Sequence, residues 1–240
     1  MEIPQARRDT YPERELKMHM DCPARYRHEV VEGLRGGRDD TPYVQFHRCV
    51  YRTVGWLESE RQAGRNADLT AGLERLQAEW AERGPVGHGF EAYYRGAAEG
   101  MVRAMAAAIA GEVGTYDRQE WKVTLGTSSV SVTPDRVLIS PEGIVRVQRN
   151  RTGKKTKSEH DQPLYALMRL GAQQRYPGKQ ISVETFYLAS GDVVVVPPGN
   201  EDRQLKKYTD AIAAIEIGEF PTKPEQRKCP NCTFYFSCGS

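Results

Sequence analysis

The chain has 240 residues, 39% hydrophobic and 28% charged, with enough aromatic side chains to exclude a disordered polymer. Its 34 basic and 32 acidic residues nearly cancel, so net charge alone gives no argument for a polyanionic partner. No apolar stretch approaches the roughly 20 residues of a membrane-spanning helix, and the opening MEIPQARRDTYPERE lacks the apolar core of a signal peptide. We therefore expect a soluble cytoplasmic protein with no membrane partner.

The first half of the chain predicts helices, because apolar residues recur at helical spacing. The first covers Glu13–His19, with Thr10 and Glu13 as a capping box, and a second follows a break at Cys22-Pro23. Longer helices are predicted over 43–61, 70–83 and 90–109.

From residue 119 the pattern changes to alternation rich in β-branched residues, which is typical of strands. Strands over 119–125, 129–139 and 144–150 predict an antiparallel meander. A helix over 160–175, strands over 181–188 and 193–196, and a helix over 200–217 follow.

Three cysteines stand in the tail as C-x2-C-x5-C, at Cys229, Cys232 and Cys238. A C-x2-C turn points both sulfurs to one side, so the three thiolates can converge on one metal centre, with Cys22 as the natural fourth ligand. Cys49 falls within a predicted helix face and is interpreted as a buried apolar residue. Spacing alone does not separate zinc from an iron–sulfur cluster.

Cys22-Pro23-Ala24-Arg25-Tyr26 resembles the opening of the iron–sulfur branch of the PD-(D/E)XK nuclease superfamily, which includes AddB/RecB-like and CRISPR-adaptation nucleases. In that branch an early cysteine and a C-terminal C-x2-C-x5-C bind a [4Fe-4S] cluster. The resemblance therefore implies such a cluster on Cys22, Cys229, Cys232 and Cys238, with zinc as the alternative.

The resemblance extends over nearly the whole chain and implies an α/β fold with a restriction-endonuclease-like core, in which helices flank a mixed sheet. It predicts one nuclease-like domain over 1–240. Within it we expect a helical region at 43–110, an α/β core at 119–217, and a cysteine staple formed by residue 22 and residues 229–238.

Catalysis in this family needs a divalent metal ion that two carboxylates hold. It also needs a lysine, two residues after the second carboxylate, that orients or activates the attacking water. By resemblance, Asp135 in Thr133-Pro134-Asp135 matches the first carboxylate, and His47 matches a histidine of an early helix. Where the family has D-Y-K-T-G, this chain has R-N-R-T-G, which places Arg149 at the acid and Arg151 at the lysine. A guanidinium there repels Mg²⁺ or Mn²⁺, so the sequence predicts an inactive nuclease.

Tyr165 partly matches a Q-x3-Y helix motif that contacts DNA in the family, with the glutamine displaced by one position. His47, Asp135, Arg151 and Tyr165 are thus candidates for relics of a catalytic site. Ordinary roles are the alternative, since a single helical histidine often packs and an aspartate after proline often caps a turn.

The leading functional hypothesis is a DNA-binding, catalytically inactive domain whose phosphate contacts come from a basic segment: Arg149, Arg151, Lys154, Lys155 and Lys157. The resemblance implies a role at the nucleoid in DNA repair and recombination, on single-stranded DNA or on ends and junctions. It also implies a UvrD-like helicase partner, fused or separate; the chain has no Walker A motif of its own.

Two alternatives remain at this point. An active Mg²⁺- or Mn²⁺-dependent DNA exonuclease would need a second acid besides Asp135, such as Glu120, Glu142 or Glu184, of which Glu120 is the best placed. A structural protein–protein module would hold zinc at its cysteines and use its basic segment only as a solvated surface.

Overall fold

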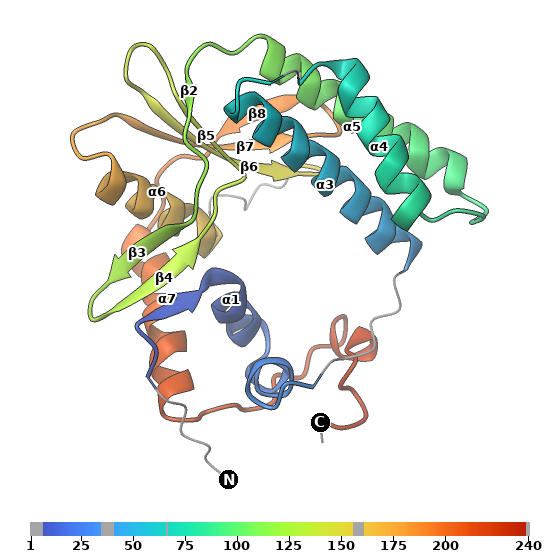
Figure 1. Ribbon diagram of the computed structural model, residues 1–240. Coiled ribbons are helices and arrows are strands. Elements are labelled where there is room, and N and C mark those ends of the chain that lie inside the picture. The colour runs from blue at the N-terminus through green and yellow to red at the C-terminus, as the bar shows by residue number, and fades with distance from the viewer. Residues whose placement is uncertain (1–6, 35–40, 66, 156–160, 239–240) are drawn as a thin grey trace.

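The computed structural model describes residues 7–34, 41–65, 67–155 and 161–238 as a mixed α/β fold (Figure 1). Its helices are α1 (Glu13–Asp21), α2 (Pro23–Tyr26), the π-helical η1 (Arg27–Val31), α3 (Pro42–Gln62), α4 (Leu69–Arg83), α5 (Glu91–Ala110), α6 (Pro163–Arg175), α7 (Glu201–Glu216) and the 3-10 helix η3 (Cys229–Asn231). Its strands are β1 (Thr10–Pro12), β2 (Thr115–Tyr116), β3 (Trp121–Leu125), β4 (Ser128–Val132), β5 (Arg136–Ile139), β6 (Val145–Arg151), β7 (Ile181–Tyr187) and β8 (Asp192–Val195). None of the helices in these ranges is long and apolar enough to cross a membrane.

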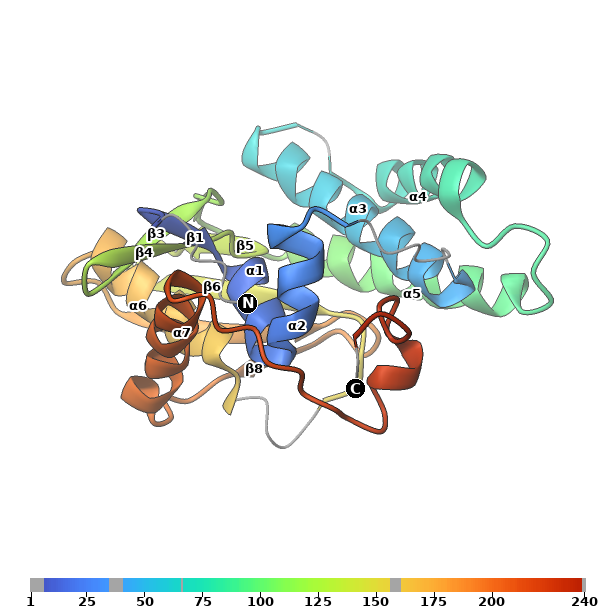
Figure 2. The ribbon, with the colours of Figure 1, turned by 90° about the horizontal axis from the view of Figure 1, so that it is seen from below.

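The strands form two sheets. The larger has five strands in the order β2-β5-β6-β7-β8, in which β6 and β7 run parallel and the other neighbours antiparallel. The smaller has three strands in the order β1-β4-β3. Helices pack against both sheets, and the cysteine-bearing tail ends the described chain (Figure 2). The predicted α/β fold with a mixed sheet and flanking helices is confirmed.

The predicted strand over 129–139 is wrong, because the structure divides it between the two sheets. β4 ends at Val132 and pairs with β3, whereas β5 begins at Arg136 and pairs with β6. Pro134 has no backbone N–H to donate to a ladder, so the chain leaves the small sheet there and enters the large one. The single three-stranded meander is therefore replaced by two separate antiparallel pairs, with Asp135 at the bend between them.

The predicted capping box at the first helix is also wrong. Thr10 lies in β1, where it pairs with Ser129, and Pro12 occupies the cap position of α1 without a side-chain hydrogen bond. The Glu13 carboxylate instead accepts a hydrogen bond from the Tyr208 hydroxyl of α7 at 3.1 Å. Strand pairing over Thr10 thus takes the place of the local cap.

One hydrophobic core lies on each side of the large sheet. One joins α1, α6, α7 and the small sheet to inward-facing residues of β5–β7, among them Val147 and Val183. The other joins α3, α4 and α5 to Phe186 and Leu188. Alternate side chains of β7 therefore enter different cores, as the pleat of a strand requires.

A buried polar network lies between α3 and the large sheet. Glu58 of α3 is 3% exposed, and its Oε1 accepts a hydrogen bond at 3.3 Å from the amide of Asn150 on β6. Arg136 of β5 lies 3.9 Å from the same carboxylate and forms an ion pair with Glu112.

The network continues along the sheet. The Arg136 guanidinium donates to the side chain of Gln148 at 3.1 Å, and Gln148 donates to Glu184 of β7 at 2.6 Å. Arg146 forms an ion pair with Glu184 at 3.0 Å. The network thus links β5, β6 and β7 beneath α3.

Glu58 makes stability pH-dependent. Burial outweighs the attraction of Arg136 and raises the pKa of Glu58 from 4.5 to about 8. Between pH 4.5 and 8 the native protein keeps this proton while the unfolded chain has lost it, so the free energy of unfolding should fall as pH rises. The slope of this fall in the free energy of unfolding approaches about 1.4 kcal/mol per pH unit.

We expect Glu58→Gln to remove this contribution and flatten the pH profile of stability measured by urea unfolding. Glu60→Gln, on the same helix, is the control, because hydrogen bonds from Arg65 lower the pKa of Glu60 and keep it ionised across that interval. A Glu58→Gln profile parallel to that of the wild type would contradict the interpretation.

Candidate functional site

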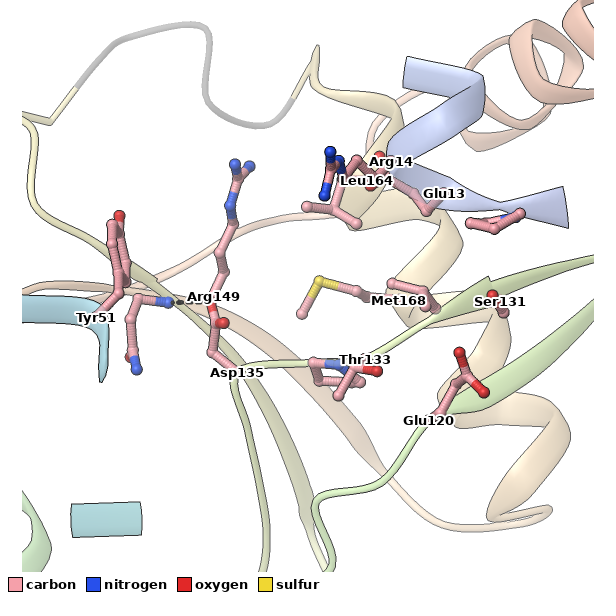
Figure 3. Close-up of a pocket in the computed structure, with 14 residues that line it drawn as sticks. Glu13, Arg14, Tyr51, Glu120, Ser131, Thr133, Asp135, Arg149, Leu164 and Met168 are labelled. Carbon is pink, nitrogen blue, oxygen red and sulfur yellow. Dashed lines mark hydrogen bonds between the residues drawn. The ribbon is translucent and has the colours of Figure 1, made fainter. Parts of the chain in front are cut away.

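A cavity of about 460 Å³ lies where the two sheets meet α1 and α6 (Figure 3). Asp135, from the bend between β4 and β5, and Arg149, from β6, both border it. The break at Pro134 brings Asp135 beside β6, and the pleat of β6 turns Arg149 toward the same cavity. These are the two positions that the sequence resemblance aligns with the acids of the family.

Asp135 is held in place by the backbone of β6. Its Oδ2 accepts a hydrogen bond from the Asn150 N–H at 2.8 Å. Burial raises the pKa of Asp135, while this hydrogen bond and the charges of Arg149 and Arg118 oppose the rise. Asp135 is therefore a partly enclosed carboxyl with two arginines nearby, and its charge also helps to raise the pKa of the buried Glu58.

Arg149 is held from α6. Its guanidinium donates to the Gln162 side chain at 2.8 Å and lies 5.8 Å from the centre of the Tyr165 ring. Both contacts fix a positive charge beside Asp135. Gln148 and Asn150 alternate with it; their side chains are amides, which are not carboxylates, and they turn toward the buried network.

Two further acids border this cavity. Glu120 lies just before β3, and Thr133 lies between it and Asp135 in the view of Figure 3. Glu13 of α1 is the other; burial raises its pKa. Glu142 is exposed in the turn after β5, and Glu184 belongs to the buried network.

His47 lies on α3 and does not border the cavity within the described chain. Its Nδ1 is 2.9 Å from the Thr152 hydroxyl, and its ring contacts Tyr43 and Tyr51. Burial lowers the pKa of His47, which favours the neutral imidazole. Tyr51, one helical turn further on, reaches the cavity in its place.

The remaining predicted residues divide between the interior and the surface. Tyr165 is 2% exposed, and its hydroxyl accepts a hydrogen bond from Thr185 at 2.8 Å. Arg151 is half-buried at the end of β6, while Lys154 and Lys155 are exposed just after it. Lys157 lies outside the described residues.

The four cysteines of the predicted staple border one small cavity of about 20 Å³. Cys22 follows α1, and the other three, Cys229, Cys232 and Cys238, come from the tail. The Glu225 N–H donates to the Cys229 sulfur at 3.1 Å. No group of three or more His, Cys, Asp or Glu side chains in the described ranges is arranged to hold a metal ion.

Cys49 is separate from these four, as predicted from its helix face. It is fully buried against α4, and its thiol donates to the Glu79 carbonyl at 3.5 Å. Burial raises the pKa of the Cys49 thiol, which favours the neutral form.

Sequence reasoning misses three features of the site. It assigns Glu13 to a helix cap, does not single out Tyr51, and does not distinguish Glu58 from the surface acids of α3. The i, i+4 spacing of His47 and Tyr51 is the one available signal, because it places both on one face of a helix.

Comparison with known proteins identifies the family. The family model for the PD-(D/E)XK nuclease superfamily matches residues 14–239. Among solved structures, the crystal structure of SSO0001 matches 98% of this chain and 88% of its own, with 13% identity and a TM-score of 0.41. No curated protein gives a significant match. Since the family model extends from α1 to beyond the last cysteine, the chain belongs to the PD-(D/E)XK nuclease superfamily.

Proposed function

We propose that this protein is a DNA-binding, catalytically inactive member of its superfamily that carries a [4Fe-4S] cluster and works with a helicase in DNA repair or recombination. The observation that carries the loss of catalysis is the placement of Arg149. It borders the same cavity as Asp135 and is anchored there by Gln162 and Tyr165.

Asp135 and Arg149, the two residues that the resemblance aligns with the family's acids, do not form a two-carboxylate metal site. Mg²⁺ and Mn²⁺ prefer several hard oxygen ligands with negative charge. Asp135 offers one carboxyl, and the neighbouring position offers a guanidinium that cannot ligate a cation. Arg151 also cannot replace the family's lysine as a group that loses a proton.

Arginines in place of the family's acid and lysine favour binding of DNA. Membership of a nuclease superfamily implies a DNA partner, and the described basic residues follow one another along β6 and the segment after it. Arg149 faces the cavity, and Lys154 and Lys155 are exposed beyond it. Lysine and arginine bind phosphates without reading sequence, so we propose binding through the backbone of the nucleic acid.

Four cysteine side chains that border one cavity support the proposal of a metal group held by thiolates. Cys22, Cys229, Cys232 and Cys238 would hold it, and soft thiolates suit iron–sulfur clusters and zinc. The resemblance of their spacing to the iron–sulfur branch of the superfamily favours the cluster over zinc. When bound, the group would supply a cross-link between α1 and the tail.

The role in repair and the UvrD-like helicase partner rest on the resemblance of the R-N-R-T-G strand to inactivated domains that accompany such helicases.

One observation favours an alternative, an active Mg²⁺- or Mn²⁺-dependent exonuclease. Glu120 borders the same cavity as Asp135 and could supply a second carboxylate.

Nuclease assays on anaerobically purified protein should distinguish these functions. We expect single- and double-stranded DNA to stay intact with Mg²⁺ or Mn²⁺, because Arg149 opposes a cation at Asp135, while anisotropy in the same samples reports binding. Cutting that is abolished by Asp135→Asn would contradict the proposal. Glu120→Gln would then test the alternative second acid, with Glu142→Gln as an exposed control.

Binding should weaken steeply with salt, because each phosphate that is bound releases counterions. We expect Lys154→Ala combined with Lys155→Ala to lower the slope of log K against log salt concentration by about 0.7 for each single-strand phosphate that the variant no longer neutralises. The matched control combines Lys122→Ala and Lys179→Ala, both exposed away from this segment. Equal slopes for the two double variants would argue against phosphate binding by Lys154 and Lys155.

Cys238→Ser should lower both iron content and the midpoint of thermal unfolding, because it removes one thiolate from the cavity that joins α1 to the tail. Iron analysis, visible absorbance and thermal unfolding measure this. Cys49→Ala is the control and should retain full iron content, because Cys49 is buried against α4. Stoichiometric zinc without iron in the wild type would support the zinc alternative.

A further inference from the structure

Three aromatic side chains lie along one face of α3: Tyr43, His47 and Tyr51. Their spacing of four residues places neighbouring side chains about 6 Å apart along the helix axis. The ring centres of Tyr43 and His47 are 4.1 Å apart, and those of His47 and Tyr51 are 6.4 Å apart with an interplanar angle of 28°. We call these three residues the aromatic stripe.

The stripe is not part of the hydrophobic core. Phe46 and Val50, on the neighbouring face of α3, are buried in the core formed with α4 and α5, and the Phe46 ring centre lies 4.8 Å from that of His47. Tyr43 is 60% exposed and Tyr51 is 41% exposed, so a large aromatic surface faces solvent. Packing of α3 therefore does not account for the two tyrosine rings.

The stripe is tied to the end of β6. The Thr152 hydroxyl lies 2.9 Å from Nδ1 of His47 and 3.4 Å from the hydroxyl of Tyr51. These contacts fix the orientation of two rings from a second element. They also place the stripe beside the segment that carries Lys154 and Lys155, two and three residues beyond Thr152.

Tyr51 connects the stripe to the cavity of Asp135 and Arg149, since it borders that cavity. Arg149 also borders a second cavity of about 400 Å³, where Lys17, Lys207 and Lys223 provide further cations. Glu13 and Asp21 border this second cavity too, and Lys17 forms an ion pair with Asp21 at 2.7 Å. Positive charge therefore continues past the stripe, with partial compensation.

Exposed rings beside cations complement one class of polyanion. Single-stranded DNA has unpaired bases that stack on aromatic side chains and phosphates that pair with lysine and arginine. The bases of a duplex are stacked on one another and do not offer their faces. Resting on the DNA binding proposed above, we propose that the aromatic stripe is a base-stacking platform for single-stranded DNA, whose phosphates lie along Lys154 and Lys155.

The three residues of the aromatic stripe have different roles. Tyr43 and Tyr51 stack bases directly. His47 is a positioning residue, because its ring lies between the two tyrosines and is hydrogen-bonded to the Thr152 hydroxyl. The strand leaves the platform at Tyr51, where the cavity with Arg149 begins.

The experiment measures fluorescence anisotropy of a labelled oligothymidine and of a labelled duplex of equal length, on the full chain purified anaerobically. Tyr43→Ala and Tyr51→Ala are each expected to weaken binding of the single strand by about 5- to 150-fold, the range measured for loss of one base–aromatic stack. Tyr43→Phe and Tyr51→Phe should bind almost as well as the wild type, because they keep the ring.

Tyr93→Ala is the matched control, since Tyr93 is 76% exposed on α5 and its ring contacts Tyr94 rather than the stripe. Thermal unfolding shows whether each variant stays folded. Tyr43→Ala and Tyr51→Ala proteins that are folded and bind like the wild type would overturn the inference, as would tighter binding of the duplex. In either case DNA binding itself would stand, whereas a wild type that binds neither oligonucleotide would remove the proposed function as well.

Discussion

Pro134 imposes the constraint on which the site depends. A proline cannot donate a hydrogen bond to a sheet ladder, so the alternating segment from 128 to 139 cannot continue as one strand. The chain passes from the small sheet to the large one within three residues, and Asp135 is held at that passage by the backbone N–H of Asn150. The cavity between the sheets, and the meeting of Asp135 with Arg149, both follow from this passage.

β6 separates two polar environments, a buried network and the cavity of Asp135. On one face, Gln148 and Asn150 join a buried network in which the carboxyls of Glu58 and Glu184 meet arginine and amide groups. On the other face, Arg149 borders the cavity of Asp135. A buried network of this kind gives little net stability but strongly disfavours the loss of one partner, because the remaining charge would be buried alone. It therefore fixes which residues of β6 face the cavity.

Much of the fold could be predicted from the sequence, because the helices and most strands have strong apolar periodicity. The break at Pro134 was missed because the alternation of apolar residues continues on both sides of it. β1 and β2 have three and two residues, too few for periodicity to detect. The prediction of a capping box at Thr10 is wrong for another reason. Thr10 pairs with Ser129, and this pairing depends on contacts between residues distant in sequence.

The candidate site was predicted unevenly. The nearness of Asp135 and Arg149 follows from family resemblance, whereas the shared cavity of the four cysteines follows from their spacing as well as from that resemblance. Glu58 was missed because a glutamate in a helix is usually exposed, and only the tertiary structure shows arginine and amide groups covering it.

The position of the cysteines also bears on the order of events during synthesis. Cys22 leaves the ribosome early, whereas its three companions are among the last residues of the described chain. A metal group bound by all four thiols can be completed only after the sheets and the helices between them have been translated. Binding of the metal group would then depend on prior folding that brings α1 to the tail. The metal group would therefore bind to a domain that has already folded and would not nucleate its folding.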